Sequence, residues 1–314
     1  MKRPSKVWLK IAHICVMLDK CIPVIASRSA SFIHKNAIAI MLILVIAVYL
    51  FNGIQYIQAQ SITYDEGNFY NYAVRYLKGN PDRINPMTDD SKMPVSVLNT
   101  IPRILEQLIE PNSQKTDMGV SDIIHGRYIT LFFSIFILLL IFIWTKELYG
   151  KKGALFAAFL FSFCPNNMAL ATLVTTDSYS VFFLLLSIYL VWKFCKTKSI
   201  YVFLFLSFSV AVSQLVKQSL FHLYILVPFC LLSYFISFRK AIKDVSLTKL
   251  TFLFILINLV VINAGYYFYH SFMRLGEYHF MSNLFLTLQK IFPESLPIPF
   301  PKPFIDGLDM GIYY

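Results

Sequence analysis

Apolar stretches of membrane-spanning or slightly shorter length recur along this chain, and polar segments of very different sizes separate them. About 20 apolar residues cross the hydrocarbon core of a bilayer, and the first stretch has that length. Backbone groups inside the bilayer must bond within the chain, which favours helices. The pattern predicts an all-α polytopic membrane protein with about seven transmembrane helices, at residues 37–56, 128–144, 153–173, 179–192, 200–215, 220–238 and 250–268.

The polar segments divide the chain into three predicted parts. Residues 1–36 are basic, and charges interrupt their apolar positions too often for a span, so we expect a cytoplasmic segment at the membrane interface. Residues 37–268 form the transmembrane domain, with a large first loop at 58–127. Residues 269–314 form an extracytoplasmic, proline-rich tail. Its prolines favour an extended chain, and we expect the tail to finish without a helix and to be incomplete.

Composition supports the membrane class, and the distribution of charge predicts the topology. The chain is 57% hydrophobic and 14% charged, whereas about 25% of the residues in a soluble domain are charged. Its net charge of +11 comes from basic residues at the N-terminus and in alternate short loops. The positive-inside rule then predicts a cytoplasmic N-terminus and an extracytoplasmic 58–127 loop, in a cell membrane that we expect to be a bacterial inner membrane. A nucleic-acid partner is not needed to explain this charge.

Several familiar chemistries lack their motifs in this sequence. The five cysteines show no CxxC spacing, and the six histidines show no spacing typical of metal ligands. The chain contains no D-x-D, no phosphate-binding GxxxxGK[ST], no HExxH and no GxSxG. We therefore predict no metal site and identify no cofactor.

The first candidate site begins the large loop, at Asp65 and Glu66. Thr63 and Glu66 fit the S/T-x-x-E capping box, so both acids could simply begin a helix through residues 70–77. Alternatively, Asp65 could act as a general base that takes the proton of an acceptor hydroxyl. The two interpretations are compatible, because a helix N-terminus would hold the carboxylate rigidly.

A second acid and three cations are predicted on the same side of the membrane. Asp177 precedes the fourth span, where it could be an N-cap or a second cleft acid. Lys217 lies in a turn between apolar stretches, Lys92 in the large loop and Arg127 at the end of the second span. Each has an ordinary structural explanation, but together the three could neutralise a phosphate.

The order of short motifs resembles a known family. The chain is similar to the integral-membrane glycosyltransferases related to protein O-mannosyltransferases and to the aminoarabinose transferase of lipid A. The resemblance covers roughly residue 37 to the end. It rests on Tyr64-Asp65-Glu66, Lys92-Met93-Pro94, Gly126-Arg127, KELYGKKGAL at 146–155, VTTD at 174–177, VKQS at 216–219, NAGYYF at 263–268 and LPIPFPKPFIDGLD at 296–309.

The resemblance implies a GT-C fold and a polyprenyl-phosphate sugar as the donor substrate. Asp65 would act as base or position the acceptor, and Asp177 would line the same cavity. Glu66, Lys92, Arg127 and Lys217 are the expected substrate-binding residues. We thus expect an inverting transferase that acts on a protein, lipid or glycan hydroxyl at the outer face. The alternatives are a transporter or lipid flippase, and a non-catalytic, truncated membrane partner, because family members usually continue into further spans.

Overall fold

The computed structural model describes residues 36–84, 86–89, 91–110, 119–237 and 246–313. The predicted interfacial segment 1–36 therefore lies almost entirely outside the described residues. A first helix, Asn36–Ala59, is followed by α2 (Tyr64–Leu77), α3 (Pro86–Asp89), η1 (Pro94–Thr100), α4 (Ile101–Ile109), α5 (Val120–Ser162), α6 (Pro165–Ala171), α7 (Asp177–Thr197), α8 (Ile200–Ser213), η2 (Gln218–His222), α9 (Leu223–Ser237), α10 (Leu247–Gly265), η4 (Leu275–Glu277), α11 (Asn283–Ile291) and α12 (Lys302–Tyr313).

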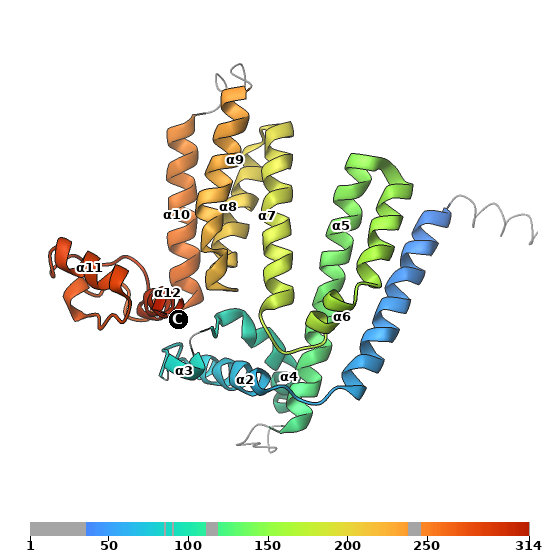
Figure 1. The fold of residues 1–314 in the computed structure, drawn as a ribbon, viewed down its shortest axis with the longest axis horizontal. Helices are drawn as coiled ribbons and strands as arrows, with labels where there is room; N and C mark the ends of the chain where they lie inside the picture. Colours follow the sequence, from blue (N-terminus) through green and yellow to red (C-terminus); the bar gives the residue numbers. More distant parts are fainter. Residues whose placement is uncertain (1–35, 85, 90, 111–118, 238–245, 314) are drawn as a thin grey trace, which may run out of the picture.

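Helices of membrane-spanning length confirm the all-α polytopic class. Five described helices are long and apolar enough to cross a bilayer. This number differs from the seven predicted spans for two reasons. α5 contains a reversal at Gly150, where φ is +78°, and Figure 1 shows its two limbs lying antiparallel. α8 is apolar but has only 14 residues.

The third predicted span breaks where its proline suggested. The second limb of α5 ends at Ser162, and α6 begins at Pro165, as expected for a residue that lacks an N–H but fits the first helical turn. The segment after α6 then leads directly into α7. This short connection carries backbone groups that the functional site uses.

The helices form two packed groups, and α5 of the first group lies next to α7 of the second. The first helix packs against α5 and α6 through a cluster that includes Tyr49, Leu131 and Ala158. α7 to α10 pack around a second cluster that includes Phe194 and Leu206. The ring centroids of Phe133 in α5 and Tyr179 in α7 are 4.5 Å apart, and this contact joins the two groups.

The described part of the large loop is folded into short helices and lies across one end of the bundle (Figure 1). The capping box predicted from Thr63 and Glu66 begins α2, and the helix through 70–77 is confirmed. α2 buries Phe69, Tyr70 and Tyr72 against the bundle. The reversal at Gly150 and the α7–α8 connection lie at the opposite end (Figure 1). The arrangement agrees with the predicted separation of loops, while the cytoplasmic location of the N-terminus stays a prediction.

The proline-rich tail differs from its predicted form. The segment between α11 and α12 is non-helical, as the prolines suggested, but α12 follows directly and runs to Tyr313. The expectation that no helix finishes there is wrong, because Pro303 lies in the first turn of α12, where a missing N–H costs nothing. Phe304 and Met310 are buried, so α12 is packed against the rest of the chain.

Candidate functional site

Glu66 and Arg127 form a completely buried ion pair between α2 and α5. Arg127 Nε donates to Glu66 Oε1 at 2.8 Å, and Arg127 Nη2 donates to Glu66 Oε2 at 2.7 Å. Both side chains have no exposed area. This two-pronged geometry is the strongest form of an arginine–carboxylate pair.

Other donors and acceptors complete the Glu66–Arg127 pair. Arg127 also donates to the carbonyl oxygens of residues 57, 60 and 61, and Glu66 accepts from the N–H of Thr63 and of Val174. The pair thus ties together the end of the first helix, α2, α5 and the segment before α7. The carboxylate and guanidinium are fully used within the protein, so we assign the pair a structural role instead of the substrate contact expected for it.

The environment of Glu66 stabilises its charged form. Burial alone would raise the pKa of this carboxyl, but the hydrogen bonds from Arg127, Thr63 and Val174 and the charge of Arg127 outweigh that effect. The pKa therefore lies below its ordinary value.

A second buried contact sets the distance between η1 and α5. The Asn99 amide donates to the carbonyl of Gly126 at 2.8 Å and to the hydroxyl of Thr130 at 2.6 Å, while Tyr179 donates to Asn99 Oδ1 at 3.2 Å. A Cβ at Gly126 would lie 3.0 Å from the Asn99 carbonyl oxygen and 3.1 Å from Val174. Gly126 therefore permits the close approach, and Asn99 is a structural residue that our sequence reasoning missed.

Asp65 contrasts with the neighbouring Glu66. It lies in the first turn of α2 and is exposed. Among the described residues, no hydrogen bond or ion pair of its carboxylate is found. The buried Glu66 fixes the backbone on which Asp65 stands, so Asp65 presents an unpaired carboxylate from a rigid support.

Asp177 and Lys217 meet directly. Lys217 Nζ lies 2.6 Å from Asp177 Oδ1, across 40 residues of sequence, and each side chain is about one-third exposed. Thr176 is the N-cap of α7, so Asp177 occupies the first helical position instead of the cap, where its charge favours the helix N-terminus. The prediction that these groups emerge on one side agrees with this contact.

Lys92 lies behind the same region and is buried, unlike a solvated loop lysine. Its Nζ is 3.9 Å from the centre of the Phe69 ring and 3.0 Å from the hydroxyl of Ser91. The N–H of Val95 donates to the carbonyl of Leu215 at 3.1 Å, which joins this loop to the turn that carries Lys217. Together with the hydrogen bond from the Val174 N–H to Glu66, these contacts bring the segments that carry the predicted site residues to one end of the bundle.

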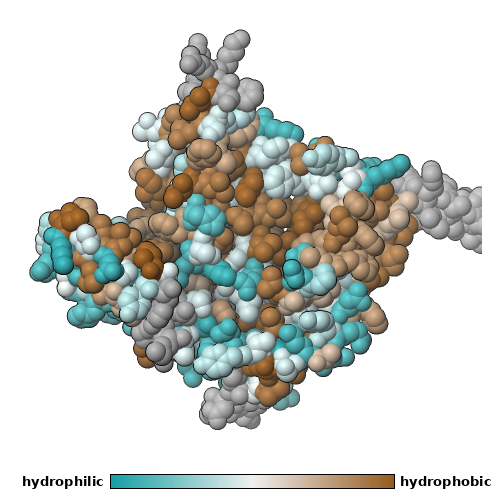
Figure 2. Space-filling view, in the orientation of Figure 1, coloured by the Kyte–Doolittle hydropathy of each residue, from teal (hydrophilic) through white to brown (hydrophobic). Residues whose placement is uncertain are grey.

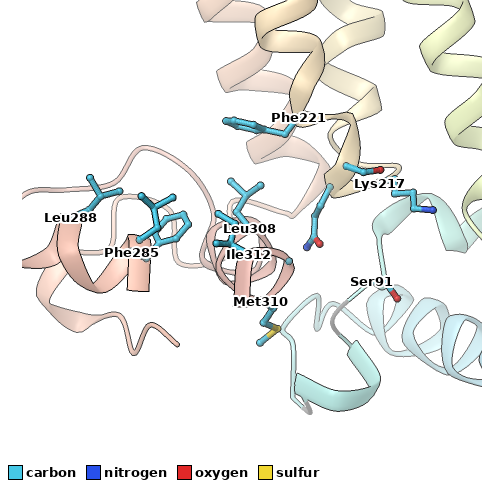
Figure 3. A pocket seen from close by; sticks show the side chains of 12 residues that line it. Ser91, Lys217, Phe221, Phe285, Leu288, Leu308, Met310 and Ile312 are labelled. Atoms are coloured by element: carbon cyan, nitrogen blue, oxygen red, sulfur yellow. The ribbon is translucent and has the colours of Figure 1, made fainter. Parts of the chain in front are cut away.

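A cavity of about 600 Å³ opens beside Lys217. Figure 3 shows Lys217 and Ser91 on one side, α11 on the other, and α12 between them. One end is polar, and the remaining wall is largely apolar. The lining residues are Ser91, Lys217, Gln218, Ser219, Phe221, Leu284, Phe285, Leu288, Leu308, Met310, Gly311 and Ile312. Asp65 and Asp177 are not among them, and apart from Leu308, which lies in the motif at 296–309, no apolar lining residue of α11 and α12 belonged to a motif in the sequence.

In the described part of the chain, no three His, Cys, Asp or Glu side chains are grouped so that they could hold a metal ion. The polar groups of the site are carboxylates, lysines, an amide and hydroxyls. Such a set can accept a proton and stabilise an anion beside an apolar chain.

Comparison with known proteins gives one family. Residues 119–266 match the family model described as dolichyl-phosphate-mannose-protein mannosyltransferase. No curated protein and no solved structure matches the chain. The matched segment carries Arg127, Asp177 and Lys217, whereas Asp65 and Lys92 precede it. The matched segment is somewhat less than half of the chain, and together with the all-helical membrane fold it supports a membrane glycosyltransferase of the GT-C type.

Proposed function

We propose that this chain transfers a sugar from a polyprenyl-phosphate donor to an acceptor hydroxyl at the extracytoplasmic face, with inversion at the anomeric carbon. The main supporting observation is Lys217, held by Asp177, at the polar end of a largely apolar cavity. A lysine is a compact charge that suits a phosphate, and an apolar wall suits an isoprenoid chain.

The proposed reaction is a single displacement. The acceptor oxygen attacks the anomeric carbon from the face opposite the phosphate and forms the new glycosidic bond. The bond between that carbon and the phosphate oxygen breaks, and its electron pair leaves with the polyprenyl phosphate. Asp65 takes the hydroxyl proton, and Lys217 stabilises the charge that develops on the departing phosphate.

The other site residues have supporting roles in this proposal. Asp177 orients the Lys217 ammonium through their 2.6 Å contact and contributes a second carboxylate at the same end of the bundle as Asp65. Lys92 adds positive potential next to Ser91, which lines the cavity. Glu66 and Arg127 hold the first turn of α2, and with it Asp65, against the segment that leads to Asp177.

A transfer assay tests this proposal. The purified protein in lipid vesicles is given radiolabelled polyprenyl-phosphate mannose, the donor type named by the matched family, with a membrane extract as acceptor source. We expect the wild type to release polyprenyl phosphate and Asp65→Asn to be slower by about 10²–10⁴-fold, the usual contribution of a general base. Glu294→Gln removes another exposed carboxylate and should keep wild-type activity.

Three other results would contradict the proposal. Equal rates for the wild type and Asp65→Asn would remove Asp65 from the reaction. Movement of the intact donor between leaflets without loss of the sugar would favour the flippase alternative. A wild type that does neither would favour a non-catalytic partner.

A further inference from the structure

Residues 266–313, which we name the C-terminal lobe, expose large apolar side chains. Ile291 is 68% exposed and Phe292 is 48% exposed, and Leu284, Phe268 and Phe272 are also exposed. α11 has no fully buried side chain. Such a concentration of apolar surface on a small lobe indicates a contact with something outside the chain.

The sequence of α11 separates this apolar surface into a stripe. Leu284, Leu288 and Ile291 follow the i, i+4, i+7 spacing of one helix face, whereas Asn283 and Lys290, seven residues apart and both exposed, lie on another. The Gln289 amide donates to the carbonyls of residues 275 and 278 at 2.9 and 3.0 Å, which fixes the orientation of α11 on the lobe. The stripe therefore faces away from these anchors.

The lobe begins where a membrane helix ends. α10 exposes Phe252, Ile255 and Val260 along its length, ends at Gly265 and continues directly into the lobe. Figure 2 shows brown, apolar atoms over the upper part of the lobe and teal atoms along its lower and outer edges. The apolar surface of the lobe thus continues from the lipid-facing surface of the bundle at the level of the helix ends.

An unusual turn places aromatic rings beside this level. Tyr267, Phe268, His270 and Phe272 have φ between +49° and +62°, a region that bulky residues rarely adopt. The N–H of Phe272 donates to the carbonyl of residue 298 at 2.9 Å, and this bond holds the turn against the proline-rich segment. The turn leaves Phe268 and Phe272 exposed directly after α10, where aromatic residues typically mark a membrane interface.

Charge favours neutral lipid as the occupant of this surface. The lobe carries Arg274, Lys290 and Lys302 against four carboxylates, so it has no cationic excess to attract anionic headgroups. Lys302 is also paired with Asp306 at 2.6 Å. Apolar burial, rather than electrostatic attraction, must therefore supply the binding free energy.

We propose that the C-terminal lobe is seated in the bilayer interface on the side of α2, with the α11 stripe, Phe268 and Phe272 among the lipid chains. The lobe then lies in the membrane surface without crossing it, and α11 forms a wall of the cavity at the depth where a lipid-linked chain would enter. The bilayer contact itself does not depend on which reaction the protein catalyses.

Spin-label accessibility tests this seating. The five cysteines are replaced by alanine, and single cysteines are introduced as Ile291→Cys and Phe292→Cys, with Asn283→Cys and Lys290→Cys as controls on the polar face of α11. The full chain is placed in phosphatidylcholine vesicles. At residues 291 and 292, we expect collisions with lipid-soluble oxygen to exceed those with a water-soluble nickel chelate several-fold, with the opposite order at 283 and 290.

The alternatives give distinct results. More nickel than oxygen collisions at 291 and 292 would place the stripe in water and overturn the proposal. Low collision rates with both reagents would indicate a protein contact, such as a second copy of this chain, and would also overturn it. Adding phosphatidylglycerol or raising the salt concentration should leave the ratios unchanged. A clear change would refute seating by apolar contact. Because these readouts do not involve transfer, their failure is distinguishable from failure of the proposed function.

Discussion

Two ion pairs join distant segments at the same end of the bundle, and they differ in how completely protein surrounds them. Glu66 and Arg127 have no exposed area, whereas Asp177 and Lys217 are each about one-third exposed. The first pair bonds to backbone groups of residues 57, 60, 61 and 63 and of Val174, and the second lies beside an open cavity. The comparison shows that the protein encloses the first pair completely and leaves the second open to solvent, so only the second pair is accessible to a bound molecule.

The largest expected effect is on stability at the buried pair. Arg127→Ala leaves the Glu66 carboxylate buried without its partner, which typically costs about 3–5 kcal/mol. We expect a correspondingly large loss in the free energy of unfolding, measured by denaturant titration in detergent micelles. Lys193→Ala breaks a similarly close but exposed pair with Glu147 and should change stability by less than about 1 kcal/mol. Equal losses in the two variants would show that burial does not distinguish the pairs.

The Asp177–Lys217 pair, which is about one-third exposed, should show the opposite behaviour. Lys217→Gln should alter stability by only about 0.2–1 kcal/mol, the usual value of an exposed pair. Donor turnover should fall by about 10²–10³-fold, the size of effect seen when one electrostatic donor is removed from an active site. Lys193→Gln is the matched control, because its pair has nearly the same exposure. Normal turnover by Lys217→Gln would contradict the phosphate role.

A smaller effect is expected where η1 approaches α5. Gly126→Ala would place a methyl group 3.0 Å from a backbone carbonyl and 3.1 Å from Val174. Overpacking typically costs about 1–3 kcal/mol, and the better helix propensity of alanine offsets up to about 1 kcal/mol of this. We expect a net loss of stability, visible as a lower thermal midpoint. A raised midpoint would show that η1 can move away without cost.

The smallest expected effect is the loss of folding stability in acid that comes from the buried pair. The pKa of Glu66 is lowered in the folded state, so its contribution to stability is present above the unfolded pKa of about 4.3 and is lost as pH falls through the folded pKa. Thermal unfolding from about pH 6 to about pH 3 should show a steeper loss for the wild type than for Glu66→Gln. Parallel curves would mean that Glu66 does not contribute to acid sensitivity.

Local patterns in the sequence predicted much of the fold. The spacing of Thr63 and Glu66 predicted the start of α2, and Pro165 predicted the break between α5 and α6. The alternation of basic and polar loops correctly placed Asp177 and Lys217 at the same end of the bundle. These features follow from helix capping, backbone geometry and apolar length, which neighbouring residues determine.

The sequence by itself therefore determined the membrane class, the order of helices and the candidate charges. Only the tertiary structure decided that Glu66 is enclosed while Asp65 is exposed, although the two are adjacent carboxylates. It also decided that α12 packs against the Gln218 side chain and that residues of α11 and α12 line the cavity beside Lys217. The physical reason is that burial depends on segments far apart in the chain, such as the Val174 N–H that reaches Glu66. No spacing within one segment records such a contact.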